Sequence, residues 1–306
     1  MPFDRLRPFI VSKDQLRSVF PRYAIGTNLI GSMIVAMLAV AISACRIPGK
    51  SLDSNYKNVS QFNFDVAVGA QQYHIEGYLT HTGEQGRRPA MLVLNGEPGS
   101  VDRCVQMSQS VAAMGIQVAC VNIPGYGGSS GPSRFVGQPS VLASRRALDL
   151  LAARTDVDTS RLAVWGLGHG AVAAGLLMDY DTRPRVLILQ SGCYDMLTLW
   201  PEAPLRTKLS ILREVWPSKR VLKERSVMAH LPPKLEISVL IMHGERDNKM
   251  PVRQAMKLAD ALRARGAKVS TCYFPKLSHD LGKRAEPELR AFLRDNLLAV
   301  SRAAAS

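Results

Sequence analysis

The stretch Leu162-Ala163-Val164-Trp165-Gly166-Leu167-Gly168-His169-Gly170 decides the fold of this 306-residue chain. Its first part, Leu162–Trp165, is an apolar run typical of a buried strand. Glycines follow at positions 166, 168 and 170, and the apolar segment Ala171–Met178 predicts a helix directly after them. Closely spaced glycines allow a strand and a helix to approach each other across a sharp turn. The stretch therefore predicts a strand, a tight turn and a helix in immediate succession.

Short apolar runs alternate with helical stretches along most of the chain. Runs without polar residues are typical of strands that are buried on both faces of a parallel sheet. Strands joined by helices predict a doubly wound, mostly parallel α/β sheet with right-handed crossovers. The alternating segments 61–69 and 73–80 predict a β-hairpin-like pair at the edge of this sheet. The expected strands are Ala90–Leu94, Ile116–Val121, Leu162–Trp165, Val186–Leu189, Val239–Met242 and Val269–Phe274, and the expected helices are 102–114, 141–154, 169–179, 252–265 and 286–301.

One segment, at about residues 196–235, interrupts the alternation. It contains two of the three tryptophans, Trp200 and Trp216, and residues 196–230 hold seven basic residues against three acidic ones. We expect a helical cap over the carboxyl edge of the sheet. Its tryptophans either anchor the cap to the body of the domain or line a ligand pocket beneath it.

Four further motifs follow predicted strands. They are Asn95-Gly96-Glu97-Pro98-Gly99-Ser100, the glycine-rich turn Pro124–Gly131, the segment His243–Pro251 and Ser278-His279-Asp280. Together with the Gly166–Gly170 turn, they occur in the order of the corresponding motifs of the α/β-hydrolase family, which the chain resembles over roughly residues 60–301.

The resemblance implies a role for each matching position. Asp247 matches the acid of the family's catalytic triad and His279 its base, while the backbone amides of Glu97 and His169 match the oxyanion hole. The family's nucleophile position is Gly168, which has no side chain that can attack a substrate. This degenerate turn also resembles, loosely, the fermentation–respiration switch-type branch of the superfamily.

Other residues near the expected catalytic edge are weaker candidates for the missing nucleophile. Ser191 and Cys193 follow a strand, with Asp195 two residues further on, and Ser100 lies in the oxyanion loop. None of them lies on a strand–helix turn, which presents and activates the nucleophile in this fold. We expect His169 to be a packed or pocket-facing residue rather than a base, and the Pro124–Gly131 turn to carry no chemistry.

The N-terminal region has the features of a targeting segment. No charged residue occurs between Tyr23 and Cys45, and basic residues precede this apolar stretch. Its end, Ile42-Ser43-Ala44-Cys45, resembles the lipobox of bacterial lipoproteins, which implies lipidation of Cys45. The alternatives are an uncleaved signal-anchor helix and a buried helix of a soluble protein. We predict a signal or anchor at 1–45, a linker at 46–60, the α/β domain at 61–301 and a tail at 302–306.

Composition excludes several classes of protein. The chain is 46% hydrophobic and 21% charged, which excludes a disordered chain. The net charge is +14, but no nucleic-acid-binding motif accompanies it, so nucleic acid is not an expected partner. The five cysteines do not make a disulfide scaffold and show no pairing by spacing, and we expect Cys120 and Cys272 to pack as thiols. No metal site or cofactor is expected, because no Cys/His cluster has ligand spacing.

Three functions are compatible with the sequence. The first is a hydrolase of ester, amide or other acyl substrates in which His279 and Asp247 activate a water. The second is a non-catalytic descendant whose pocket binds a small ligand or partner. The third is a membrane-associated interaction protein whose cationic surface meets anionic lipid or envelope polymer. With either a lipoprotein signal or an uncleaved anchor at the N-terminus, we expect the domain to lie outside the cytoplasm, anchored to a membrane of a bacterial envelope.

Overall fold

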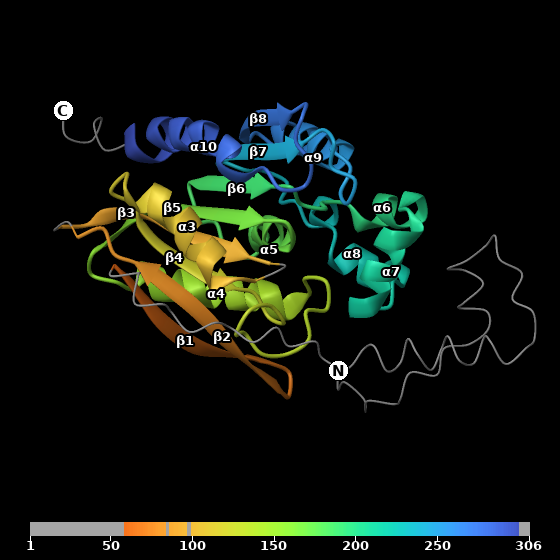
Figure 1. The fold of residues 1–306 in the computed structure, drawn as a ribbon, viewed down its shortest axis with the longest axis horizontal. Coiled ribbons are helices and arrows are strands. Elements are labelled where there is room, and N and C mark those ends of the chain that lie inside the picture. Colours follow the sequence, from red (N-terminus) through yellow and green to blue (C-terminus); the bar gives the residue numbers. More distant parts are fainter. Residues whose placement is uncertain (1–57, 84–85, 97–98, 300–306) are drawn as a thin grey trace, which may run out of the picture. The chain divides into compact units, whose positions relative to one another are not determined.

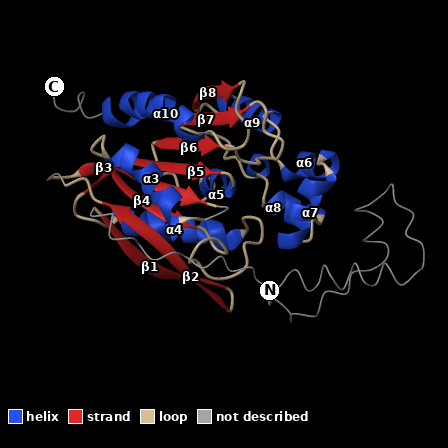
Figure 2. Ribbon diagram, in the orientation of Figure 1, coloured by secondary structure: helices blue, strands red, loops and turns tan. Residues whose placement is uncertain are grey.

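The computed structural model describes residues 58–83, 86–96 and 99–299. These residues form an eight-stranded sheet in the order β1-β2-β4-β3-β5-β6-β7-β8, with helices on both of its faces (Figures 1 and 2). The strands from β3 onward are parallel, which confirms the predicted doubly wound α/β sheet. The bounds are β1 Val59–Val68, β2 Gln71–Thr80, β3 Arg88–Asn95, β4 Gln117–Asn122, β5 Val157–Leu167, β6 Val186–Gln190, β7 Ser238–Gly244 and β8 Lys268–Phe274.

Strands β1 and β2 form the predicted hairpin at one edge of the sheet. They pair in antiparallel fashion from Val59 with Thr80 to Val68 with Gln71, and β2 then pairs in antiparallel fashion with β4. The alternation of side chains in β1 leaves one face exposed, because only strands between two helical layers are buried on both faces.

Helices cover the sheet in two layers. Helices α3 (Val101–Ala112) and α10 (Glu286–Leu293) bury their apolar side chains against one face. Helices α4 (Gln138–Ala152), α5 (His169–Leu177) and α9 (Arg253–Arg263) pack against the other face. Helix α5 is buried along almost its whole length, which explains why its sequence is apolar all round.

The final helix is shorter than the sequence indicates. The stretch 286–301 is predicted as one helix, whereas α10 ends at Leu293 and continues as the π-helical segment η3 (Arg294–Leu298).

The cap consists of short helices between β6 and β7. They are α6 (Met196–Glu202), α7 (Leu205–Glu214), α8 (Lys219–Glu224) and the 3₁₀ turn η1 (Val227–Ala229), and Figure 1 shows α6, α7 and α8 grouped beyond the ends of the strands. Trp200 is partly buried and packs against the hydrophobic core, which supports the anchoring interpretation for this tryptophan. Lys208 Nζ lies 5.9 Å from the centre of the Trp200 ring.

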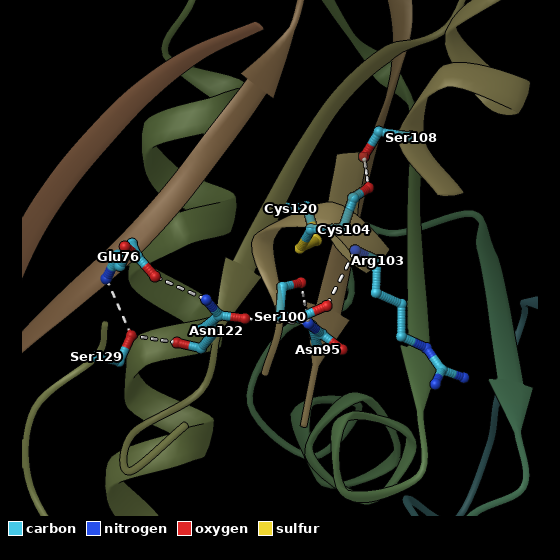
Figure 3. The surroundings of a disulfide bond; sticks show 9 residues. All are labelled: Glu76, Asn95, Ser100, Arg103, Cys104, Ser108, Cys120, Asn122 and Ser129. Carbon is cyan, nitrogen blue, oxygen red and sulfur yellow. Dashed lines mark hydrogen bonds between the residues drawn. A yellow bond between two sulfur atoms is a disulfide. The ribbon is translucent and has the colours of Figure 1, made fainter. Parts of the chain in front are cut away.

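The expectation that Cys120 packs as a free thiol is wrong. Cys104 of α3 and Cys120 of β4 form a disulfide, with their Cα atoms 5.8 Å apart (Figure 3). Helix α3 is the crossover between β3 and β4 and packs against β4, so the fold brings the two cysteines together although their spacing gives no signal. Cys272 and the buried Cys193 are free, as expected for Cys272.

The predicted N-terminal segment and linker, with Cys45, lie outside the described residues, as does the tail. Among the residues that are described, no helix is long and apolar enough to cross a membrane.

Candidate functional site

Gly168 lies at the sharp turn between β5 and α5, as predicted. Its backbone has φ +51° and ψ −115°, a left-handed conformation that is strained for any residue with a side chain. Its N–H donates a hydrogen bond to the carbonyl oxygen of Gln190, at 2.9 Å. A Cβ atom on Gly170 would overlap the carbonyl oxygen of Leu94, so the close approach of helix and strand requires glycine there. The turn has the geometry in which this type of fold presents a nucleophile.

Asp247 and His279 meet at the same edge of the sheet. Asp247 follows β7 and His279 follows β8, and these neighbouring parallel strands end side by side. Nδ1 of His279 and Oδ2 of Asp247 are 2.7 Å apart. The Asp247 side chain is fully buried, whereas the His279 side chain is 29% exposed. The carboxylate therefore fixes the ring of His279 and leaves the ring's other nitrogen available for chemistry.

Three further groups hold the Asp247 carboxylate. The amides of Lys249 and Met250 both donate to Oδ1 at 2.9 Å, and Nε2 of the buried His243 lies 3.1 Å from Oδ2. Burial alone would raise the pKa of Asp247. Hydrogen bonds from His243, from His279 and from the Met250 amide outweigh burial and lower this pKa well below the usual range. Asp247 is therefore a permanent anion near neutral pH. Sequence reasoning did not identify His243 as its second partner.

His279 faces the space beside Gly168. A Cβ atom built on Gly168 would lie 3.7 Å from Nε2 of His279, and apart from its chain neighbours no other atom of the described residues would lie within 4 Å. A side-chain oxygen attached to that Cβ would reach hydrogen-bond distance of Nε2, because a C–O bond spans about 1.4 Å and hydrogen bonds between such atoms span about 2.7–3.2 Å. The two residues therefore stand in the spatial relation of a nucleophile position and its base.

His169 is a packed residue, in agreement with its prediction. Its Nδ1 lies 2.8 Å from the hydroxyl oxygen of Tyr126, and its ring meets that of Phe135 edge-on at a centroid distance of 4.6 Å. Tyr126 belongs to the Pro124–Gly131 turn, to which we assigned no chemistry. The structure brings this turn into the candidate site, and neither periodicity nor spacing in the sequence signals it.

The cap reaches the same cluster through Glu214, at the end of α7. Its Oε2 accepts hydrogen bonds from the Tyr126 hydroxyl at 3.1 Å and from the Phe135 amide at 2.9 Å. Glu214, Tyr126 and His169 thus form a continuous chain of contacts from the cap to the residue after Gly168.

The loop at Arg134–Val136 is strained. Arg134, Phe135 and Val136 have φ values of +45°, +46° and +53°, and consecutive non-glycine residues in this region persist only where their surroundings hold them. The cap supplies two of these contacts: Glu214 binds the Phe135 amide, and the Arg225 Nε donates to the Arg134 carbonyl at 2.9 Å.

A buried polar network supports the loop that begins at Asn95. The carboxylate of Glu76 accepts a hydrogen bond from the side chain of Asn122 at 2.8 Å, and Asn122 Oδ1 accepts one from Asn95 Nδ2 at 3.1 Å (Figure 3). Asn95 Nδ2 also lies 3.3 Å from the carbonyl oxygen of Ser100, at the other end of the loop. The side chain of Asn95 therefore connects the start of the loop with its end at Ser100. Glu97, the predicted oxyanion residue of this loop, lies outside the described residues.

A cavity of about 410 Å³ opens between α3 and α10, next to the His279 loop. Two of its lining residues are next to Gly168. Leu167 precedes Gly168 in the chain, and the carbonyl oxygen of Gln190 accepts the hydrogen bond from the Gly168 amide. An ion pair between Arg103 and Asp280, at 3.2 Å, lies on its wall. The volume is within the range of small-molecule sites.

The other candidate residues either cap the N-terminus of a helix by a side-chain hydrogen bond or are buried. The Ser100 hydroxyl accepts the Arg103 amide as the N-cap of α3, and the Asp195 side chain accepts the Thr198 amide as the N-cap of α6. Ser191 and Cys193 are each 2% exposed, and burial raises the pKa of the Cys193 thiol. Within the described part of the chain, no group of histidine, cysteine and acidic residues is arranged to hold a metal ion.

The fold and the edge at which Asp247, His279 and Gly168 meet define an α/β-hydrolase-fold protein. A model of the prolyl oligopeptidase family matches residues 104–295, more than half of the chain, and the chain belongs to this family.

Relatives and solved structures agree with this assignment. An uncharacterized protein of Mycobacterium tuberculosis is 30% identical over 204 residues, which are 64% of this chain and 66% of the relative. Acylamino-acid-releasing enzyme 2 of rice is 27% identical over 67% of this chain, which spans 29% of that enzyme. The fold is similar to that of Pyrococcus horikoshii acylaminoacyl peptidase, with a TM-score of 0.65 and 16% identity over 79% of this chain and 42% of that chain. The chain thus spans less than half the length of these peptidases.

Proposed function

We propose that this protein is an acyl hydrolase in which His279 and Asp247 activate a water molecule in place of a serine nucleophile. The observation that carries the proposal is the geometry at Gly168: the Asp247–His279 pair is intact at 2.7 Å, and Nε2 of His279 faces the space where a nucleophilic side chain would begin.

In the proposed reaction, Nε2 of His279 takes a proton from a water that attacks the acyl carbon of an ester or amide. The backbone amides of His169 and Glu97, by resemblance to the family, stabilise the oxyanion that forms. The imidazolium then gives its proton to the leaving alcohol or amine as the bond to the acyl group breaks, and the acyl group leaves as a carboxylic acid. Asp247 stays ionised and stabilises the imidazolium.

Slow hydrolysis is expected, because a water activated by a base replaces the covalent step of a serine enzyme. Purified protein assayed with p-nitrophenyl esters and with N-acyl-amino-acid p-nitroanilides tests the proposal. The second substrate class follows from the acylamino-acid-releasing relatives. His279→Ala should abolish the activity, and a serine-directed fluorophosphonate should label neither protein. Equal rates for wild type and His279→Ala would refute the hydrolase function.

The alternative is a non-catalytic module that binds a ligand or partner at the same site, beside Gly168 and His279. Gly168 itself favours it, since glycine removes both the nucleophile and the strain of the turn. A degenerate turn of this kind also fits the likeness to the fermentation–respiration switch-type branch. Binding of a substrate analogue with unchanged affinity in His279→Ala, without turnover in either protein, would select this function.

We further propose that the domain is tethered outside the cytoplasm of a bacterial cell. The Ile42–Cys45 sequence supports lipidation, and the Cys104–Cys120 disulfide supports an oxidising compartment. Fractionation of cells that express wild type or Cys45→Ala tests the tether. Loss of processing in the variant supports a lipoprotein, whereas membrane partition without any change in processing supports an uncleaved anchor. A wild-type chain that stays in the soluble fraction contradicts both.

A further inference from the structure

Helix α7 of the cap combines exposed leucines with exposed arginines on one side. At about 3.6 residues per turn, Leu205, Leu209 and Arg213 follow one another at four-residue intervals, and Arg206 lies next to them. Leu205 is 52% exposed and Leu209 36% exposed, and they are two of the four large apolar side chains that are exposed in the described residues. The buried residues of the helix, Thr207 and Ile211, lie on the opposite side.

The positive charge of this surface is not neutralised within the described residues. Arg206 and Arg213 on α7 are exposed and form no ion pair with any described acidic residue. The acidic residues of the cap are engaged elsewhere: Glu202 pairs with Arg253, Glu214 binds Tyr126, and Glu224 pairs with Arg220 and Arg225.

We propose that this cap surface, formed by Leu205, Arg206, Leu209 and Arg213 of α7, docks on a membrane that contains anionic lipids. Leucines interspersed with arginines fit the boundary between acyl chains and headgroups, where apolar side chains insert while cations meet lipid phosphates. A nucleic acid would use the cations but would leave the leucines without a partner. Helix α7 is only about 15 Å long, which is short for a stable interface with a second protein.

The docking surface is connected with the proposed reaction centre. Glu214 ends the same helix and binds Tyr126 and the Phe135 amide, beside His169. A lipid surface that contacts α7 therefore contacts the element that covers the candidate site. The proposal itself depends only on the surface and stands whether or not the pocket is catalytic.

The tryptophans provide a local probe in the full-length chain. Trp200 and Trp216 are both in the cap, Trp165 is 5% exposed inside the domain, and the N-terminal segment contains no tryptophan. Quenching of tryptophan fluorescence by brominated lipids therefore reports contact of the cap and not insertion of the N-terminus. We expect brominated phosphatidylglycerol in mixed vesicles to quench several-fold more than brominated phosphatidylcholine alone, and high salt to reverse the difference.

A matched pair of variants tests the surface. Leu209→Glu/Arg213→Glu should reduce quenching to the phosphatidylcholine level. Tyr180→Glu/Lys268→Glu makes the same change in charge at exposed positions near the opposite edge of the sheet, where α5 ends and β8 begins, and should quench like wild type. Circular dichroism confirms that both variants are folded.

Four results would overturn the proposal. One is quenching by wild type that does not depend on anionic lipid. Another is quenching that survives Leu209→Glu/Arg213→Glu. The third is competition by a soluble polyanion such as DNA that depends on the arginines but not on Leu209, which would show that the surface recognises charge alone. Concentration-dependent dimerisation that Leu209→Glu abolishes would assign the surface to a second copy of the chain instead.

Discussion

The hydroxyl of Tyr126 donates a hydrogen bond to Oε2 of Glu214 across 3.1 Å, and this contact joins the turn after β4 to the cap. The same hydroxyl lies 2.8 Å from Nδ1 of His169, and Glu214 also holds the strained loop at Phe135. The cap is therefore not an independent lid. It is part of the structure that positions the first residue of α5, whose backbone amide is a proposed oxyanion donor.

Removal of either partner in this contact should loosen the cap. Tyr126→Phe and Glu214→Ala should each lower the free energy of unfolding. A double-mutant cycle should give a coupling of about 1.5 kcal/mol, because each single variant already removes the hydrogen bond between the two side chains and the double variant cannot remove it again. Chemical denaturation measures the energies, and limited proteolysis of residues 196–235 measures cap opening. Strictly additive effects would show that the two groups do not interact in solution.

Gly168→Ser should create or strongly raise hydrolysis of activated esters. The serine oxygen would lie within reach of His279 Nε2, which Asp247 already orients, and the variant would have all three members of a triad. The left-handed backbone at this position should cost about 1–3 kcal/mol of stability. Ester turnover, fluorophosphonate labelling and thermal unfolding measure these effects together.

The control is Gly168→Ser/His279→Ala, which keeps the serine and removes its base. It should lose the new activity and be less stable than Gly168→Ser, because the buried Asp247 carboxylate loses its hydrogen bond from His279. A folded Gly168→Ser protein with neither turnover nor labelling would mean that the pocket is not competent for hydrolysis, and would favour the binding function.

Asp247→Asn should destabilise the protein in a pH-dependent manner. The folded-state pKa of Asp247 is below its unfolded value, so the carboxylate contributes stability that is present above about pH 3.9 and is lost as the pH falls toward the lower folded-state pKa. We expect a loss of about 2 kcal/mol near pH 7, because a fully buried, hydrogen-bonded anion is replaced, and a smaller difference from wild type at pH 3. Urea denaturation across this range measures the difference. Asp260→Asn, at an 81% exposed side chain, should change little at either pH.

Loss of the disulfide should destabilise the domain without changing its fold. Cys104 and Cys120 are 16 residues apart, and closure of a loop of about 15 residues corresponds to about 3 kcal/mol in the chain-entropy model. Cys104→Ala/Cys120→Ala should therefore unfold at lower denaturant concentration. A reductant should weaken wild type but leave this variant unchanged. An equal response of both proteins would show that the bond is not formed in solution.

The sequence was sufficient for the sheet and for the order of its motifs. Buried parallel strands such as Val186–Leu189 are apolar throughout, and the turn at Gly168 is marked by glycines that strand–helix contact requires. The pairing of Asp247 with His279 also followed, from the resemblance of the motifs around them to those of the α/β-hydrolase family.

The contacts that complete the site were not predictable in this way. Tyr126 and Glu214 are 88 residues apart and meet only because the cap folds back over the turn after β4. His243 lies near the end of β7, a strand that is buried from Val239 onward. A residue in such a strand is expected to belong to the core, so the sequence pattern gives no sign that His243 contacts Asp247. Cys104 and Cys120 meet because α3 packs against β4, and the pattern of apolar residues in the sequence does not show which strand a helix packs against.

Strands β5, β6, β7 and β8 lie in the sheet in the same order as in the chain, whereas β4 precedes β3 between the hairpin and β5. A chain that is synthesised from its N-terminus can therefore extend this half of the sheet by one strand at a time at a growing edge. Gly168 leaves the ribosome early in that process, while His279 follows the last strand to be added. An incomplete chain carries the turn without its base, so the reaction centre that we propose forms only in a nearly finished molecule.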